Sequence, residues 1–463
     1  MSVMIDGFNL SLHKGTGIAT YSRNLSYALS HLGHSVDVLY GERRSPRSLA
    51  LMREIAFFDD NVGALPKWLR ALGMGYRTLR SPLYRRPDAV PLTGTVEIRQ
   101  FLDKLPFFDR LWNAPNIFSH AFMFNQLTGG MLRIKPPGGT SAMHWTSLVP
   151  ARAIGVPNIY TVHDLIPLRL PYTTLDNKDK FYRMTQRIIK CADGIITVSD
   201  NSARDIISIF PEAEPKLRVT YQSSRIPAKL LMSPRSEIDR DVENLLPVKA
   251  GKYFLFFGSI EPKKNIGRLV EAFLAAHTDH KLIIVGAQAW KAEEELRLLN
   301  HANYLRWESS GTTMREDRRI VTVEYLTFSR LVSLIRCAKA VVFPSLYEGF
   351  GLPVLEALQC GTRVITSDTS SIPEVGGTLA TYVDPYDIRD IKIALERLSL
   401  EERAGPVFAA AAHDFVRKFS VDAHAERLQA AYDAYGVRRP PARPVTQVLA
   451  PAGQAPALSE VAA

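Results

Sequence analysis

The stretch from residue 340 to residue 361, AVVFPSLYEGFGLPVLEALQCG, constrains the fold more than any other part of the sequence. Its apolar start, Ala340 to Phe343, is typical of a buried strand, which Pro344 ends. The glycine-rich turn that follows is too flexible for regular structure, and Pro353 suits the first turn of a helix. A buried strand, a glycine-rich loop and a helix are the building unit of open α/β sheets.

Two glutamates accompany this loop, Glu348 within it and Glu356 about one turn into the expected helix. Open α/β sheets bind ligands at the carboxyl ends of their strands, beside helix amides that favour anions. Glycines let backbone amides approach a ligand, and a carboxylate can accept hydrogen bonds from two sugar hydroxyls. The alternative is a surface glutamate followed by a helix-capping glutamate.

The N-terminal region repeats this alternation. Val3 to Asp6 is expected to form a strand, followed by the loop HKGTG at residues 13–17. A helix then places Ile18, Tyr21, Leu25, Ala28 and Leu32 on one face, and Val36 to Tyr40 returns as a strand. A lone G-x-G is weak evidence for phosphate binding, so ligand contact by Gly17 and an ordinary turn both stay open.

Further strands are expected at residues 116–122, 140–144, 157–164 and 194–199. The third of these ends in the polar pair His163-Asp164, and the second ends at His144, a weaker candidate for the acceptor side. A histidine at a strand end is often structural, yet ligands bind at this edge of a sheet. Ser199 or Asp200 is expected to cap a helix, with ligand contact as a second role.

The C-terminal region begins with the apolar run YFLFFG, residues 253–258, as expected for a strand covered on both faces. Lys263 and Lys264 follow it and precede a helix that continues through Phe273. Two lysines at a helix N-terminus are unfavourable beside the positive end of the dipole, unless an anion binds there. A diphosphate is the natural candidate. More strands (281–286, 320–324, 363–366) and helices (328–337, 386–398, 407–419, 423–435) alternate, which indicates a parallel doubly wound sheet.

These motifs resemble those of family 4 glycosyltransferases, retaining enzymes of the GT-B fold. The resemblance rests on the E-x7-E spacing of Glu348 and Glu356, on the run TVHDLIPL around His163, and on EPKKN around Lys263 and Lys264. The family often has arginine at the position of Lys263, and lysine keeps the charge without the bidentate fork. The family's usual Asn-Gly is replaced here by residues 222–224, QSS.

The resemblance implies a role for each side chain of the donor site. Glu356 is expected to bind the ribose hydroxyls of a nucleotide-sugar, and Lys264 with Lys263 to neutralise the departing diphosphate. The donor's phosphates and sugar are expected to meet backbone amides at Phe350, Gly351 and Leu352.

Three more contacts follow from the family. Glu348 is expected to orient the sugar or stabilise positive charge at its anomeric carbon. His163 is expected to contact the donor sugar, and the loop ending at Gly17 to face the cleft between domains. Because two lysines and a helix N-terminus balance the leaving charge, no metal and no other cofactor is expected.

The family and the 463-residue length together predict two facing Rossmann-like domains with a cleft between them. An N-terminal acceptor domain is expected over residues 1–226, a linker over 227–251 and a nucleotide-sugar domain over 252–419. A helix over 420–436 is expected to cross back, before a disordered tail over 437–463 that is rich in proline and alanine. The D-x-D in the linker, residues 239–241, is interpreted as a solvated charge pair. Residues 370–375, SSIPEV, resemble a family segment near the site, although helix capping explains them equally well.

The net charge of +10 indicates an anionic partner. Basic residues interleaved with aromatic and aliphatic ones fit either an anionic membrane surface or a solvated face: Lys67, Arg70, Arg77, Arg80, Arg85 and Arg86. No nucleic-acid motif is present, so a nucleic-acid partner is not expected. Three dispersed cysteines, no signal-peptide pattern and no apolar run long enough to span a bilayer indicate a cytoplasmic protein. Peripheral contact with the inner face of the cytoplasmic membrane remains open.

The expected activity is retaining hexosyl transfer in cell-surface polysaccharide synthesis, such as that of lipopolysaccharide, to a glycan or lipid-linked oligosaccharide. GDP-mannose is the favoured donor, because the EPKKN and HDLIPL combination resembles bacterial polysaccharide mannosyltransferases. Three alternatives stay open. They are a UDP-sugar donor, a nucleotide-sugar epimerase or hydrolase of the same fold, and a binding module without catalysis.

Overall fold

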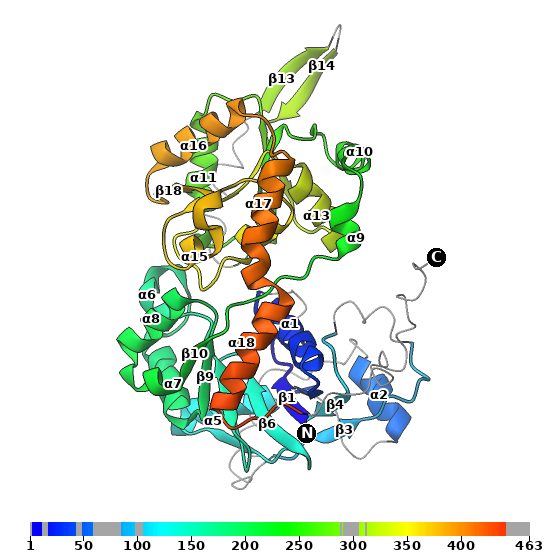
Figure 1. The fold of residues 1–463 in the computed structure, drawn as a ribbon, viewed down its shortest axis with the longest axis vertical. Helices are drawn as coiled ribbons and strands as arrows, with labels where there is room; N and C mark the ends of the chain where they lie inside the picture. Colours follow the sequence, from blue (N-terminus) through cyan, green and yellow to red (C-terminus); the bar gives the residue numbers. More distant parts are fainter. Residues whose placement is uncertain are drawn as a thin grey trace.

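Two sheets, one in each half of the chain, form the framework of the molecule (Figure 1). The computed structural model describes residues 2–11, 17–42, 49–58, 85–97, 105–287, 289, 305–310 and 313–440. We call the part built on the sheet that contains residues 2–6 the first lobe, and the part built on the sheet that contains residues 253–257 the second lobe. The α/β, doubly wound architecture predicted from the sequence is confirmed.

The sheet of the first lobe has the strand order β10-β9-β8-β6-β1-β2-β4-β3 and is parallel except for the β3–β4 pair. Its strands are β1 (Ser2–Asp6), β2 (Ser35–Tyr40), β3 (Asp88–Val90), β4 (Arg110–Asn113), β6 (Thr140–Trp145), β8 (Asn158–Thr161), β9 (Gly194–Thr197) and β10 (Leu217–Val219). A separate parallel pair joins β5 (Leu132–Ile134) to β7 (Ala151–Ala153). The helices of this lobe are α1 (Gly17–His31), α2 (Ala50–Phe58), α5 (Ile117–Thr128), α6 (Ile166–Arg169), η1 (Pro171–Thr173), α7 (Lys178–Cys191), α8 (Asp200–Ile209) and η2 (Pro211–Lys216).

The sheet of the second lobe is parallel throughout and has the order β15-β12-β11-β16-β17-β18. Its strands are β11 (Tyr253–Phe257), β12 (Lys281–Val285), β15 (Ile320–Val323), β16 (Ala340–Phe343), β17 (Val364–Ser367) and β18 (Ala380–Val383). Every residue of β11 is buried, as its continuous apolar sequence predicted. An antiparallel hairpin, β13 (Leu305–Ser310) and β14 (Thr313–Arg318), projects from this lobe (Figure 1).

Helices cover both faces of this second sheet. They are α9 (Ala228–Met232), α10 (Arg235–Leu245), η3 (Pro262–Lys264), α11 (Ile266–Ala275), α13 (Phe328–Cys337), α14 (Leu352–Gln359), α15 (Ile372–Gly376), η6 (Gly377–Leu379), α16 (Ile388–Leu400) and α17 (Pro406–Val416). The chain then passes through η7 (Arg417–Phe419) into α18 (Val421–Ala434), which packs beside α1 in the first lobe (Figure 1). Helix α18, the last described helix, therefore packs in the first lobe, whereas α17 packs in the second.

The strand predicted for residues 116–122 is wrong, because this segment opens helix α5. Asn116 has a φ of 55°, which turns the chain away from an extended course. The residues that follow bury one side of the helix at helical spacing: Ile117, Phe118, His120 and Ala121. Gly129 ends the helix in the left-handed conformation. Short apolar runs do not distinguish a buried strand from a buried helix.

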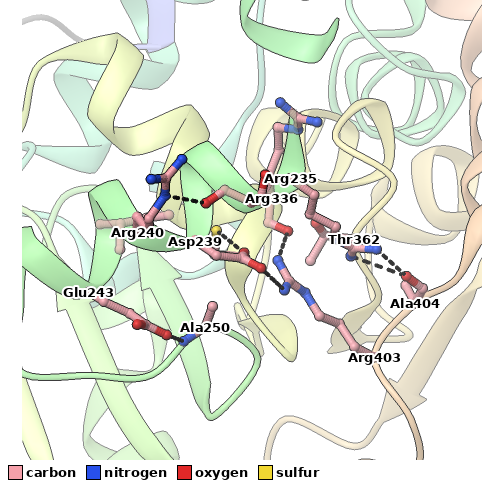
Figure 2. A network of polar contacts seen from close by, with 12 residues as sticks. Arg235, Asp239, Arg240, Glu243, Ala250, Arg336, Thr362, Arg403 and Ala404 are labelled. Carbon is pink, nitrogen blue, oxygen red and sulfur yellow. Dashed lines mark hydrogen bonds and ion pairs between the residues drawn. The ribbon is translucent and has the colours of Figure 1, made fainter. Parts of the chain in front are cut away.

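Residues 227–251 hold two helices, α9 and α10, which contact α13. The interpretation of Asp239 as a solvated charge is also wrong. Its carboxylate accepts a hydrogen bond from Arg403 Nη1 at 3.1 Å and one from Cys337 Sγ at 3.1 Å (Figure 2). Because Arg403 Nη2 also donates to the carbonyl of Arg336 at 2.7 Å, this cluster fastens α10 to the second lobe.

Within the described part of the chain, no helix is both long enough and apolar enough to cross a bilayer. Most of the basic stretch predicted as a membrane-facing or solvated surface, Lys67 to Arg80, lies outside the described residues, as do residues 13–16 and 441–463.

Candidate active site

The strand order of the second lobe brings two loops of the site together. Strands β11 and β16 are neighbours, with Phe254 opposite Ala340, so the loops at their carboxyl ends meet at one edge. The amide of Leu346 donates to the carbonyl of Lys263 at 2.8 Å. Asn265, whose φ is 60°, donates a hydrogen bond from its side-chain Nδ2 to the carbonyl of Pro344 at 3.0 Å. These bonds fix the lysine-containing loop against the glutamate-containing loop.

A buried ion pair joins the two loops. Lys264 Nζ lies 2.6 Å from Glu348 Oε1, and the two side chains are only 11% and 9% exposed. Lys263 Nζ lies 3.6 Å from Glu261 Oε1. The sequence predicted both lysines and Glu348 as site residues, and the structure brings them together.

Electrostatics keep this cluster charged. Burial alone raises the pKa of Glu348, but Lys264 and Lys263 outweigh it and hold that pKa below its usual range. Burial opposes the charge on Lys263, yet Glu348, Glu261 and Asp164 outweigh burial and raise the Lys263 pKa. The free protein therefore balances its two lysines with carboxylates of its own.

Two serines hold the backbone of Glu348. Its amide donates to Ser370 Oγ at 2.9 Å, and its carbonyl accepts from Ser371 Oγ at 2.9 Å. Gly351 follows in the left-handed region, with φ 107°, and opens α14. The first α14 bonds run from the Val354 and Leu355 amides to the Gly351 carbonyl, at 3.0 and 3.2 Å. The amides at Gly351 and Leu352 therefore precede the helix's own hydrogen bonding, as an anion-binding helix start requires.

Glu356 lies on α14 and faces the junction of the lobes. Its side chain is hydrogen-bonded to Ser224, and Gln359 Nε2, one turn on, donates to the Ser224 carbonyl at 3.1 Å. Burial raises the pKa of Glu356 to about 7, against a smaller lowering by the Ser224 bond. The departure from Asn-Gly at residues 222–224 thus places a serine against this carboxylate.

His163 follows β8 and belongs to the first lobe. Its Nε2 lies 2.8 Å from the carbonyl of Thr146, and its ring meets the Tyr21 ring edge-on with centroids 4.7 Å apart. Gly17 is the first residue of α1, and a Cβ there would meet no atom within 4 Å.

The suggestion that His144 serves the acceptor side is wrong. His144 is fully buried, and its ring nitrogens contact Tyr432 at 2.7 Å and Thr161 at 2.8 Å. Burial lowers its pKa to about 3, helped by His424 and His163. His144 is a neutral core residue that ties α18 to the first sheet, which its place at a strand end could not reveal.

The two lobes touch at the glycine-rich loop. The carbonyl of Gly349 accepts bonds from Ser199 Oγ at 2.7 Å and Ser202 Oγ at 3.2 Å. Ser199 also accepts from the Ser202 amide at 3.0 Å, so its predicted role as helix cap is confirmed and a contact between lobes is added.

A carboxylate of the second lobe reaches the N-terminus of α8 in the first. Glu374 accepts from the amides of Asp200 at 2.9 Å and Asn201 at 2.7 Å. A carboxylate is favourable at this helix end, because it satisfies free amides and meets the positive end of the dipole. Glu374 was singled out by family resemblance, but its target in the other lobe was not predictable.

We expect Gly349→Ala to reduce turnover at least tenfold and leave nucleotide affinity unchanged. A Cβ at this position would lie 2.7 Å from the His163 carbonyl and 3.1 Å from Asp164 Cβ, so the lobes would have to move apart. Steady-state kinetics and nucleotide titration of the variant check this. Gly405→Ala, where a Cβ meets nothing within 4 Å, is the control. Equal kinetics for both variants would show that the contact at Gly349 is dispensable.

Comparison with known proteins assigns the chain to a family. Residues 16–221 match the glycosyl transferase 4-like domain, and residues 237–413 match glycosyl transferases group 1. Together the two matches take in well over half of the chain.

Curated relatives include mannosyltransferases. The serotype-specific mannosyltransferase WbdA of Escherichia coli is 30% identical over 267 residues, 56% of this chain and 31% of the relative. The O-antigen chain mannosyltransferase B of Escherichia coli is 30% identical over 241 residues, 50% of this chain and 58% of the relative. The matches therefore span about a third to just over half of these relatives. The MMP alpha-(1->4)-mannosyltransferase of Mycolicibacterium hassiacum is 23% identical, covering 86% of this chain and 89% of its own.

Solved structures share the fold along most of the chain. Sucrose-phosphate synthase from Thermosynechococcus elongatus superposes with a TM-score of 0.60 at 17% identity, covering 94% of this chain and 98% of that one. HepE of Anabaena, in complex with UDP and glucose, gives a TM-score of 0.60 at 13% identity, covering 94% and 100%. The two family matches, together with the shared fold, identify the chain as a glycosyltransferase of the GT-B fold. Within that class, the chain belongs to glycosyltransferase family 4.

Proposed function

We propose that this protein transfers a mannosyl group from GDP-mannose, with retention of configuration, to a glycan or lipid-linked oligosaccharide in cell-surface polysaccharide synthesis. The cluster of Lys263, Lys264 and Glu348 at the carboxyl ends of β11 and β16 supports this most directly. It offers two cations for a diphosphate and one carboxylate for a sugar. The names of the relatives from Escherichia coli support the mannosyl group and the polysaccharide.

The Lys264–Glu348 ion pair suggests how the donor's diphosphate binds. A diphosphate that binds beside η3 competes with Glu348 for Lys264, since both carry negative charge. When Lys264 turns to a phosphate oxygen, the Glu348 carboxylate is released to orient the sugar or stabilise charge at its anomeric carbon. Lys263 remains charged throughout, and together the lysines neutralise the leaving diphosphate without a required metal.

The remaining contacts extend along α14 and across to the first lobe. Glu356 accepts the ribose hydroxyls in place of the Ser224 hydroxyl, and the amides at Phe350, Gly351 and Leu352 support phosphate and sugar. Because Phe350 is only 3% exposed, it contributes backbone and not its ring. His163 meets the sugar from the first lobe, and the loop ending at Gly17 faces the acceptor or phosphates.

A UDP-sugar is the second candidate donor. The structural relative HepE is bound to UDP and glucose, and its fold matches this chain over nearly its whole length. An epimerase or hydrolase of the same fold differs in chemistry, because it releases free nucleotide without any acceptor. We place the reaction at the cytoplasmic side of the membrane, where a lipid-linked acceptor is within reach.

Thermal unfolding with GDP, UDP and ADP at matched concentrations tests the proposal, on wild type and on Glu356→Ala. A nucleotide at 100 times its dissociation constant stabilises the folded state by about 2.7 kcal/mol, which gives a clear shift. We expect a selective response to GDP that the variant loses. A response to UDP alone would replace the donor and keep the enzyme class. No response to any nucleotide would contradict the proposed function.

A further inference from the structure

A buried carboxylate in the first lobe, that of Asp6, is linked to His163 through one intervening residue, Thr146. Asp6 ends β1 and has no exposed surface. Its Oδ2 accepts a short hydrogen bond from the amide of Thr146, and its Oδ1 accepts from the amide of Phe8 at 3.2 Å. Each carboxylate oxygen is therefore committed to a backbone amide.

Thr146 carries the connection onward to His163. Strands β1, β6 and β8 are consecutive in the sheet, so the loops at their carboxyl ends lie side by side. The Thr146 carbonyl forms a hydrogen bond with His163 Nε2 at 2.8 Å. From the same β1 loop, Asn9 Nδ2 donates to Ser147 Oγ at 3.0 Å and supports the next residue. Asp6 and Asn9 thus hold the segment that accepts the histidine's hydrogen bond.

This geometry determines which ring nitrogen is protonated. A carbonyl oxygen only accepts, so His163 Nε2 must carry the hydrogen. Burial lowers the pKa of His163, although the Thr146 bond and Asp164 oppose it, so the ring is neutral. A neutral imidazole protonated at Nε2 leaves Nδ1 as an acceptor. His163 can then receive a hydrogen bond from a sugar hydroxyl at Nδ1.

We propose that Asp6 is a positioning residue, which holds Thr146 so that His163 stays protonated at Nε2 and presents Nδ1 as an acceptor to a donor-sugar hydroxyl. The contact with the sugar rests on the proposed function, whereas the control of the tautomer does not. Asparagine at this position has one acceptor oxygen and one donor NH2. In Asp6→Asn, the single acceptor oxygen can serve the Thr146 amide or the Phe8 amide but not both, and the other amide then faces a donor. The β1 loop and Thr146 are no longer held by the same side chain, so the position of Thr146 is less firmly fixed.

Asp37 provides a matched control. It is also fully buried, it lies on the adjacent strand β2, and its backbone pairs with Met4. Its carboxylate binds Arg110 at 2.8 Å through both oxygens, away from His163. Asp37→Asn removes a buried carboxylate from the same sheet, so it reports general loss of stability without moving Thr146.

The test is nitrogen NMR of protein labelled at histidine, with the His163 signals assigned by their absence in His163→Gln. We expect wild type and Asp37→Asn to show one tautomer, with the hydrogen on Nε2. Asp6→Asn should show the other tautomer or a mixture, and at least a tenfold loss of turnover with unchanged GDP affinity. Asn9→Ala should move the same signals in the same direction, and it remains informative if Asp6→Asn does not fold.

Two outcomes would overturn the positioning role. One is a His163 spectrum that is unchanged in both Asp6→Asn and Asn9→Ala. The other is an equal change in Asp37→Asn, which would show a general effect of lost stability. A failure of the proposed function looks different, because wild type would then ignore every nucleotide while the tautomer result still held.

Discussion

Glu356→Gln is expected to lose measurable affinity for the nucleotide and to make the free protein more stable above pH 7. The loss of affinity follows from the proposed role, because an amide replaces one acceptor oxygen and the negative charge with a donor NH2, so it cannot offer each ribose hydroxyl its own carboxylate oxygen. The gain in stability follows from burial, which raises the pKa of Glu356 to about 7. The folded protein buries this carboxylate at a cost that the Ser224 hydrogen bond offsets only in part.

The sign of the stability effect can be worked out from the two pKa values. Below the ordinary value of 4.5 the side chain is protonated in both the folded and the unfolded chain, so there is no penalty. Between 4.5 and about 7 the unfolded chain ionises first, and the free energy of unfolding falls as pH rises. Above about 7 the penalty is complete, with an upper bound of about 3 kcal/mol.

Thermal unfolding of wild type and Glu356→Gln at pH 5 and pH 8 measures this difference. The variant should unfold a few degrees higher at pH 8, and the gap should shrink at pH 5. Glu271→Gln, at an exposed position of α11, controls for the loss of any carboxylate. A variant that binds GDP normally would sink the ribose assignment, while one less stable at pH 8 would sink the buried-carboxylate interpretation.

Local sequence signals predicted five of the six strands of the second sheet, but missed the edge strand β18 and the β13–β14 hairpin. The apolar run of β11 and the proline and glycine punctuation around α14 gave their elements correctly, because each is determined by residues close in the chain. The same local signals placed Lys264 and Glu348 in the loops that follow β11 and β16, and Glu356 on α14. Their roles toward a ligand stay predictions. The strand forecast over residues 116–122 failed because a short apolar run fits either kind of element.

The sequence could not predict which side chains far apart in the chain contact one another. The Lys264–Glu348 pair exists because β11 lies next to β16, and 84 residues separate the two side chains. The bond from Glu374 to the α8 amides crosses 174 residues and two lobes. His144 looked like a ligand contact because a strand end is a poor guide to burial. Its contact with Tyr432 depends on a helix 288 residues away.

Glu348→Ala should reduce turnover by about 10²–10³-fold without weakening nucleotide binding, and should also destabilise the free protein. Removing one partner of a buried ion pair leaves the other charge uncompensated, which costs about 3–5 kcal/mol. Here Lys264, 11% exposed, would remain beside Lys263 with the carboxylate gone. A diphosphate restores negative charge at that place. GDP should therefore raise the unfolding temperature of the variant by more than it raises that of wild type.

A double-mutant cycle separates the pair from its surroundings. Lys264→Ala should leave Glu348 without its ion-pair partner, with only Lys263 to offset its charge, and should abolish the response to GDP. The double variant should be more stable than either single variant. Unfolding temperatures of the four proteins with and without GDP, together with donor kinetics, measure every term. If Glu348→Ala kept its turnover, or gained no more from GDP than wild type does, Lys264 would not pass from carboxylate to phosphate. Its charge would then serve only to hold the two loops together in the folded protein.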